Sequence, residues 1–426
     1  MSIWYDVSGL YDWKGSFTGI QRVVYNLGQS LATGEQSARF FIFKHGSFRE
    51  VGFTELEARL KELSKLQQAP ASGPPALSLA KLHHYGMVAA KKVVLGSPVE
   101  KPLRKTYDGL RVARRKLSAP QAAVTPQMIF ESGDTVVVVD GNWQFRGFAK
   151  AIAAARAKVG FRLVHFVHDI IAIRNPALAN TGADKIIGDY FEEILLHSDK
   201  LLANSESTKR DIEWFMKDRG ITKLPVDVVI LGSDIQQAIT ITPEQPAAMA
   251  GVKNFIFAVS TIEVRKNYQL LYYTYKEAAK RGITLPRLII MGRKGWMAEE
   301  TYRLLTADPE IQDQITIVSG TDHELKWFYE NCLFTVFPSF YEGWGLPVAE
   351  ALLHGKCCVS SDTSSMPEVG GDLVRYVSPY DTNAMLQAIQ ELTDPKTRQK
   401  IEARIQAEFK PVTWQDSYES FVKALA

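Results

Sequence analysis

Two glutamates, Glu342 and Glu350, stand with seven residues between them in a segment that reads as strand, turn and helix. An apolar run, 332–337, precedes the pair, a Gly-Trp-Gly turn at 343–345 separates the two carboxylates, and a helical run, 347–353, carries the second. Ligands bind at strand exits in open α/β sheets. The free N–H groups at the start of a helix also attract an anion such as a diphosphate. The segment therefore predicts a polar ligand site with a phosphate cradle.

Short apolar runs alternate with helical patterns along most of the chain, which predicts βαβ units and parallel sheets. The predicted strands are 3–6, 40–43, 135–140, 163–168, 200–204 and 226–230 in the first half and 255–259, 287–291, 315–318, 333–337 and 357–360 in the second. The predicted helices include 19–32, 145–159 and 207–218. We therefore expect an α/β protein with two Rossmann-like domains, and the cleft between them is the default site.

A polar, Pro-containing stretch, 241–246, indicates the linker between the two series of strands. The predicted domains are 1–243, with an insertion at about 54–126, and 244–410. Residues 411–426 form an amphipathic pattern and are expected to be a final helix.

Composition sets only broad limits on function. The chain has 426 residues, 46% of them hydrophobic and 23% charged, and a net charge of +3. Its three cysteines, at 332, 357 and 358, have no histidine at metal-ligand spacing, and we interpret them as structural thiols. The first residues do not resemble a secretory signal, and no apolar run is long enough for a membrane span. These features predict a cytoplasmic protein.

The insertion contains a basic segment, 81–116, with ten Lys or Arg against two acidic residues. It could be a solvated face. It could also contact anionic lipid at the inner face of the cytoplasmic membrane, or a phosphate-bearing acceptor. Few aromatic residues stand among the basic ones, which disfavours a surface for stacking nucleic acid bases.

The segment from Phe337 to Asp372, with its runs EGWGLPVAEAL and PEVGGD, resembles the retaining glycosyltransferases of family 4. The resemblance implies the GT-B fold, with a C-terminal helix that crosses back to the first domain. It implies that Glu350 binds the ribose hydroxyls of a nucleotide-sugar, since a carboxylate can accept hydrogen bonds from two neighbouring hydroxyls. Glu342 is then expected beside the donor sugar or the reaction centre. The backbone N–H groups implied to reach the sugar and the diphosphate belong to Gly343, Trp344, Gly345 and Leu346.

Other stretches carry the same resemblance. In TIEVRKN, Lys266 and Arg265 are implied to stabilise the departing phosphate, although family members often have an arginine where this chain has Thr261. His168 and Asp169 resemble a His-Asp pair on the floor of the cleft, where the aspartate orients the histidine or receives a proton. The glycines implied to lie near the donor are Gly19, in a loop whose Arg22 reads more simply as a helix-surface charge, and Gly292.

The predicted function is transfer of a hexose to a glycan or polyprenyl-linked saccharide in cell-surface polysaccharide synthesis. GDP-mannose is the favoured donor because the VHD and TIEVRKN patterns are most similar to those of mannosyltransferases. Rhamnosyl, fucosyl or glucosyl transfer stays open, as does a non-catalytic subunit that binds a nucleotide-sugar. No Asp-x-Asp motif follows a strand, so neither a metal nor another cofactor is expected.

Overall fold

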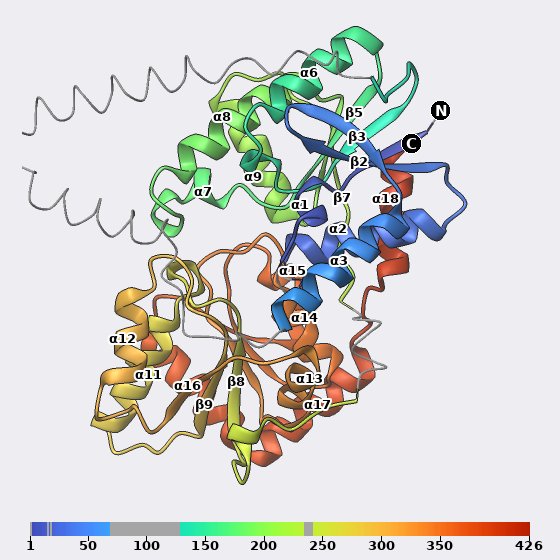
Figure 1. The fold of residues 1–426 in the computed structure, drawn as a ribbon. Helices are drawn as coiled ribbons and strands as arrows, with labels where there is room; N and C mark the ends of the chain where they lie inside the picture. The colour runs from blue at the N-terminus through green and yellow to red at the C-terminus, as the bar shows by residue number, and fades with distance from the viewer. Residues whose placement is uncertain (1, 15–16, 18, 69–127, 234–241) are drawn as a thin grey trace, which may run out of the picture.

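The computed structural model of the protein describes residues 2–14, 17, 19–68, 128–233 and 242–426. Two α/β lobes lie one above the other in Figure 1, the first blue to green and the second yellow to orange. The described residues near both ends of the chain lie on the first lobe. This arrangement confirms the predicted pair of Rossmann-like sheets.

The first lobe contains a seven-stranded sheet in the order β3-β2-β1-β4-β5-β6-β7. Its strands are β1 Ile3–Asp6, β2 Ala38–Lys44, β3 Ser47–Val51, β4 Thr135–Val138, β5 Arg162–Val167, β6 Lys200–Ala203 and β7 Val226–Val228. Its helices include α1 Ser8–Tyr11, α2 Ile20–Thr33, α3 Phe53–Gln68, α6 Phe148–Val159, α7 Ile171–Arg174, α8 Ala183–Leu195 and α9 Glu206–Asp218. All neighbouring strands are parallel except β2 and β3, which form an antiparallel hairpin that the sequence analysis missed.

The second lobe contains a parallel six-stranded sheet in the order β10-β9-β8-β11-β12-β13. Its strands are β8 Phe255–Val259, β9 Arg287–Met291, β10 Ile315–Val318, β11 Thr335–Phe337, β12 Cys358–Ser361 and β13 Arg375–Val377. Its helices include α11 Tyr268–Lys280, α12 Glu299–Ala307, α13 Asp322–Asn331, α14 Leu346–Leu353, α15 Met366–Gly370, α16 Thr382–Thr393 and α17 Pro395–Glu408. From β8 the chain adds β9 and β10 on one side and then β11, β12 and β13 on the other, so the order of the strands reverses between β8 and β11. Such a switch point is where open α/β sheets bind ligands.

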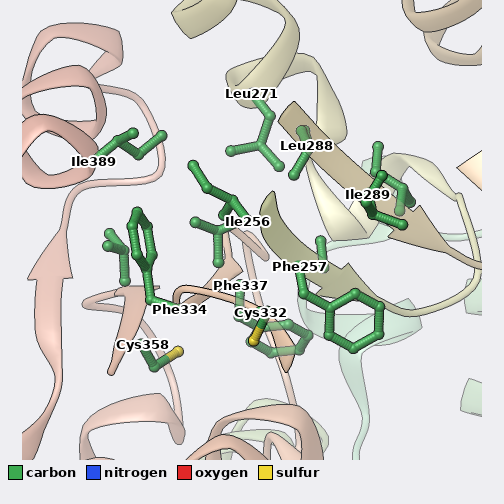
Figure 2. Packing of buried hydrophobic residues seen from close by; sticks show 14 of the residues in the cluster. Ile256, Phe257, Leu271, Leu288, Ile289, Cys332, Phe334, Phe337, Cys358 and Ile389 are labelled. Carbon is green, nitrogen blue, oxygen red and sulfur yellow. The ribbon is translucent and has the colours of Figure 1, made fainter. Parts of the chain in front are cut away.

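The core of the second lobe explains why its strands are almost continuous apolar runs. Helices cover both faces of a parallel sheet, so both rows of side chains along each strand are buried. Ile256 and Leu288 lie on the same side of the sheet as Leu271, whereas Phe257 points to the other side (Figure 2), where its ring stacks on Phe328. The three cysteines are buried and unpaired. Burial raises the pKa of the Cys332 and Cys358 thiols to about 12, which keeps them protonated and unreactive at neutral pH.

The last helix, α18 Trp414–Leu425, leaves the second lobe and packs against α2 of the first, as Figure 1 shows in red. Thr413 begins this helix with a capping box completed by Asp416. The Ser417 hydroxyl donates to the Ile230 carbonyl at 2.7 Å. The predicted crossing of the C-terminal helix is therefore confirmed. None of the described helices is long and apolar enough to cross a bilayer.

Candidate functional site

Glu342 lies in the loop between β11 and α14 and is bound by two cations from the loop after β8. Lys266 Nζ donates to Glu342 Oε1 at 2.6 Å, and the Arg265 guanidinium donates to Oε2. Both basic residues lie in or beside a short 3₁₀ turn, Val264–Lys266, which follows β8 and precedes α11. Because β8 and β11 are neighbours at the switch point, their loops meet at the carboxyl edge of the sheet.

The charges of this cluster are strongly coupled. Burial alone would raise the pKa of Glu342, but the charges of Arg265 and Lys266 lower it to about 2. Burial and the neighbouring Arg265 lower the pKa of Lys266, although Glu342 opposes this. Arg265 also bridges to Glu263 at 2.9 Å, and that carboxylate is only 1% exposed. The cluster holds two cations and two carboxylates, so its formal charges balance in the absence of a bound anion.

Glu350, on α14, has partners from both lobes. Its Oε1 accepts from the Arg22 guanidinium on α2, and its Oε2 accepts from the Tyr329 hydroxyl on α13 at 2.6 Å. The Arg22 side chain is 18% exposed and that of Glu350 is 5% exposed. Arg22 is therefore not the helix-surface charge favoured by its sequence context. It is an inter-lobe ligand of the carboxylate implied to bind ribose.

His168 follows β5 at the carboxyl edge of the first sheet. Its Nε2 donates to the Val139 carbonyl at 2.6 Å, so in the neutral ring Nδ1 is the acceptor nitrogen. Burial lowers the pKa of His168, which keeps the ring neutral at pH 7. Asp169 accepts from the Ile171 N–H at 3.1 Å, and its charge is one of those that raise the pKa of Arg265. The structure thus brings the His-Asp pair to the side of the first lobe that faces the Arg265 cluster.

The glycine turn of the second lobe contacts the first lobe directly. The Gly343 carbonyl accepts from Ser205 Oγ at 2.8 Å, and a methyl group at Gly343 would lie 2.2 Å from the His168 carbonyl oxygen. Trp344 is buried among apolar residues of the first lobe. Gly345 has φ +122°, a conformation that favours glycine, and Leu346 begins α14. We call this contact surface, formed by His168 and Ser205 against Gly343 and Trp344, the inter-lobe junction.

The two remaining glycines from the sequence analysis lie at different places. Gly19 directly precedes α2 with φ 45°, one turn before Arg22. Gly292 follows β9, and a methyl group there would lie 1.9 Å from the Ser260 carbonyl oxygen. Close packing of two loops is therefore enough to explain the glycine at position 292.

Glu368, just inside α15, is an inter-lobe residue that the sequence analysis missed. Its two carboxylate oxygens each accept a backbone N–H from the start of α9, those of Glu206 and Ser207, at 2.7 Å. Acidic groups are favourable at helix N-termini. Glu368 belongs to the PEVGGD run that the sequence analysis singled out, but the run did not indicate that this residue contacts the start of α9.

A second missed feature lies at the carboxyl ends of β1 and β4, the switch point of the first sheet. Asp140 accepts the N–H groups of Gly9 and Leu10 at 2.6 and 2.8 Å, and Asp6 is bound by Ser8 and Asn142. Burial and the nearby Asp140 raise the pKa of Asp6 to about 7. These hydrogen bonds fix the loop that leads into α1.

Within the described part of the chain, no group of three or more His, Cys, Asp or Glu side chains could hold a metal ion. The basic segment 81–116 lies outside the described residues.

The chain is similar to several known proteins. Residues 244–407 match the family model described as glycosyl transferases group 1. The O-antigen chain mannosyltransferase B of Escherichia coli is 30% identical over 165 residues, which cover 38% of this chain and 43% of that protein. The MMP alpha-(1->4)-mannosyltransferase of Mycolicibacterium hassiacum is 26% identical over 253 residues, 56% of this chain and 58% of that protein. The chain thus spans less than two thirds of the length of these curated relatives.

Two solved structures match over the whole fold. The sucrose-phosphate synthase of Thermosynechococcus elongatus superposes with a TM-score of 0.60 at 17% identity, covering 99% of this chain and 98% of that one. Anabaena HepE in complex with UDP superposes with a TM-score of 0.59 at 15% identity, covering 100% and 99%. At such identities the likeness shows the fold, which is GT-B. Residues 244–407, less than half of the chain, are similar to the group 1 glycosyltransferases.

Proposed function

We propose that the chain transfers a hexose, with mannose favoured, from a nucleotide-sugar to a hydroxyl of a glycan or lipid-linked saccharide. The observation that carries this proposal is the binding of Arg265 and Lys266 to Glu342 at the switch point of the second sheet. A diphosphate needs positive charge in a water-poor site as it leaves. The two cations supply that charge, and they pair with Glu342 when no anion is bound.

The proposed division of labour follows the two lobes. Residues 244–410 bind the donor, with Glu350 on the ribose and Glu342 beside the sugar. Residues 1–243 bind the acceptor at the carboxyl edge of the first sheet, and residues 411–426 tie the two lobes together. The backbone of residues 343–346 is proposed to reach the sugar and the diphosphate.

The proposed reaction retains the configuration of the sugar. The bond from the anomeric carbon to the phosphate oxygen breaks, the acceptor oxygen bonds to the same face, and its proton passes to the departing phosphate. Lys266 and Arg265 stabilise the charge that develops on the phosphate. His168 accepts a hydrogen bond from the acceptor hydroxyl through Nδ1, because its other nitrogen is engaged by Val139.

Two unsatisfied polar atoms, one at the inter-lobe junction and one beside it, support a polar ligand there. Among the described residues, Asn204 Oδ1 and Trp344 Nε1 are buried without a hydrogen-bond partner. Buried polar atoms in proteins are normally paired, so a missing partner calls for an explanation. A sugar hydroxyl bound at the junction would supply one.

Mannose is favoured because several matched relatives, from Escherichia coli, Mycolicibacterium hassiacum and Salmonella typhimurium, are named mannosyltransferases. Three of these names also refer to an O-antigen chain or a serotype, which supports a role in surface polysaccharide synthesis. GDP-mannose is accordingly the first donor to test. A lipid-linked acceptor would bring the protein to the inner face of the cytoplasmic membrane.

A thermal-shift screen against GDP-, UDP-, dTDP- and ADP-sugars tests the proposal, since a ligand that binds only the folded state raises the melting temperature. We expect GDP-mannose to give the largest shift and Glu350→Gln to reduce it. Release of GDP on addition of a saccharide acceptor would identify the activity. If no nucleotide-sugar shifts the melting temperature and none loses its nucleoside diphosphate, the proposal is wrong.

A further inference from the structure

The Arg22–Glu350 ion pair is unusual in its position, because it joins the two lobes at the carboxylate proposed to bind the donor ribose. Arg22 lies in the first turn of α2 and Glu350 lies in α14, 328 residues away in the sequence. Glu350 is 4% exposed, and both of its carboxylate oxygens already accept hydrogen bonds. Because Glu350 is almost fully buried, a ribose can reach this carboxylate only if one of the groups that cover it moves away.

The two partners of Glu350 differ in how firmly they are held. Tyr329 is 1% exposed, and its ring packs edge-on against Phe257 and stacks on His354 within the core of the second lobe. Arg22 is more exposed and belongs to the other lobe, where its Nε donates to the Phe17 carbonyl at 3.1 Å. Separation of α2 from α14 would withdraw Arg22 without disturbing the core, whereas displacement of Tyr329 would break the packing of α13.

We propose that Arg22 occupies the ribose position on Glu350 when no donor is bound, and that it must leave for the donor to bind. Arg22 is in this sense a positioning residue that sets donor affinity, and the inference rests on the proposed function. It stabilises the empty protein because a buried carboxylate without a partner is costly. For the same reason it opposes donor binding, since the ribose hydroxyls must replace an ion pair that already satisfies the carboxylate.

The charges around Arg22 support this assignment. Burial opposes the charged form of Arg22, but Glu350 and, more weakly, Asp322 at the start of α13 raise its pKa. Both acidic groups belong to the second lobe. Arg22 is therefore held by the lobe that binds the donor in the proposed reaction, and movement of the lobes apart would weaken this attraction.

The test compares Arg22→Gln, Arg22→Lys and the control Arg156→Gln by calorimetric titration with GDP and by thermal unfolding. Arg156 pairs with Asp199 at 2.5 Å, and Asp199 also accepts from Leu163 N–H near the amino end of β5, the edge of the sheet opposite the junction. The control thus removes an ion pair of the first lobe without touching Glu350.

We expect Arg22→Gln to bind GDP about tenfold more tightly than the wild type, within the usual range of coupling between linked equilibria. The same variant should melt at a lower temperature than Arg156→Gln, because it leaves Glu350 buried with Tyr329 alone. Arg22→Lys restores a charged partner and should restore both values toward those of the wild type. Binding of pyrophosphate, which has no ribose, should change by less than about twofold, because no ribose competes with Arg22.

Equal affinity of wild type and Arg22→Gln for GDP would overturn this inference and leave the proposed function intact. Weaker GDP binding by Arg22→Gln would also overturn it, because Arg22 would then be a ligand of the donor. If neither protein binds GDP or any nucleotide-sugar, both the proposed function and this inference are wrong.

Discussion

Replacement of Gly343 by alanine should separate the two lobes at the junction and slow the proposed reaction. The new methyl group would lie 2.2 Å from the His168 carbonyl oxygen, 3.1 Å from Asp169 Cβ and 3.2 Å from Asn204 Nδ2. The backbone oxygen cannot rotate away as a side chain could. Because a carbon and an oxygen in contact usually lie about 3.3 Å apart, the lobes must move apart by about 1 Å.

A displacement of this size affects catalysis more than folding. A misplacement of 1 Å between reacting groups can reduce the rate about 100-fold. We expect kcat to fall by about that factor, because His168 lies on one lobe and Lys266 on the other. Donor affinity should not fall, since Lys266, Glu342 and the core around Glu350 all belong to the second lobe and a withdrawn Arg22 would compete less with the ribose. The melting temperature should fall by only a few degrees, as expected for a loss of about 1 kcal/mol.

The assay measures release of nucleoside diphosphate at saturating donor together with donor affinity by calorimetry. Gly188→Ala is the matched control, because outside the adjoining backbone of α8 no atom of the described residues lies within 4 Å of the position its methyl group would take. A normal kcat in Gly343→Ala would refute the reasoning. A loss confined to donor affinity would also refute it, by showing that position 343 contributes only to donor contacts and does not set the approach of the lobes.

Three further predictions concern other parts of the site. Lys266→Ala should lower kcat by about 10²–10³, the usual loss for a group that stabilises transition-state charge. Lys294→Ala, which removes an exposed cation after β9, should not lower kcat in this way. Equal effects of the two substitutions in a turnover assay would contradict the assignment. Glu368→Ala should lower the free energy of unfolding by about 1 kcal/mol, like the loss of a helix cap, and an unchanged urea midpoint would show that this contact contributes nothing. In the folded protein the pKa of Glu342 is about 2, below its usual 4.5, so the stabilising effect of its charge is present above pH 4.5 and is lost as the pH falls toward 2. The free energy of urea unfolding should therefore decrease less over this range in Glu342→Gln than in the wild type. Identical pH profiles of the two proteins would argue against the ion pairs.

Local sequence patterns located most of the secondary structure. The eleven predicted strands correspond to strands of the two sheets, because buried parallel strands are continuous apolar runs between helical patterns. Two short edge strands were missed. Ser47–Val51 has only one fully buried residue, and Arg375–Val377 has three residues, so neither forms a clear apolar run. The available signal for a hairpin was the His45-Gly46 pair between the two runs, and in the structure both residues have the positive φ of a two-residue hairpin turn.

The sequence alone also indicated where a site could form. Glu342 and Lys266 stand after strands that are neighbours at a switch point, and this order follows from the βαβ pattern. Such residues can be found without a structure because each lies a few positions beyond its own strand. Their pairing could also be expected, since both strands belong to one sheet.

Only the tertiary structure decided which groups meet across the two lobes. Each lobe has its own core, so the patterns that fold one lobe carry no information about how it docks on the other. The docking places Arg22 on Glu350, Glu368 at the start of α9 and the Gly343 backbone against His168. In the sequence these were a surface charge, an acidic residue in a short motif and one of several glycines. Their roles depend on contacts between residues more than one hundred positions apart, which no local pattern encodes.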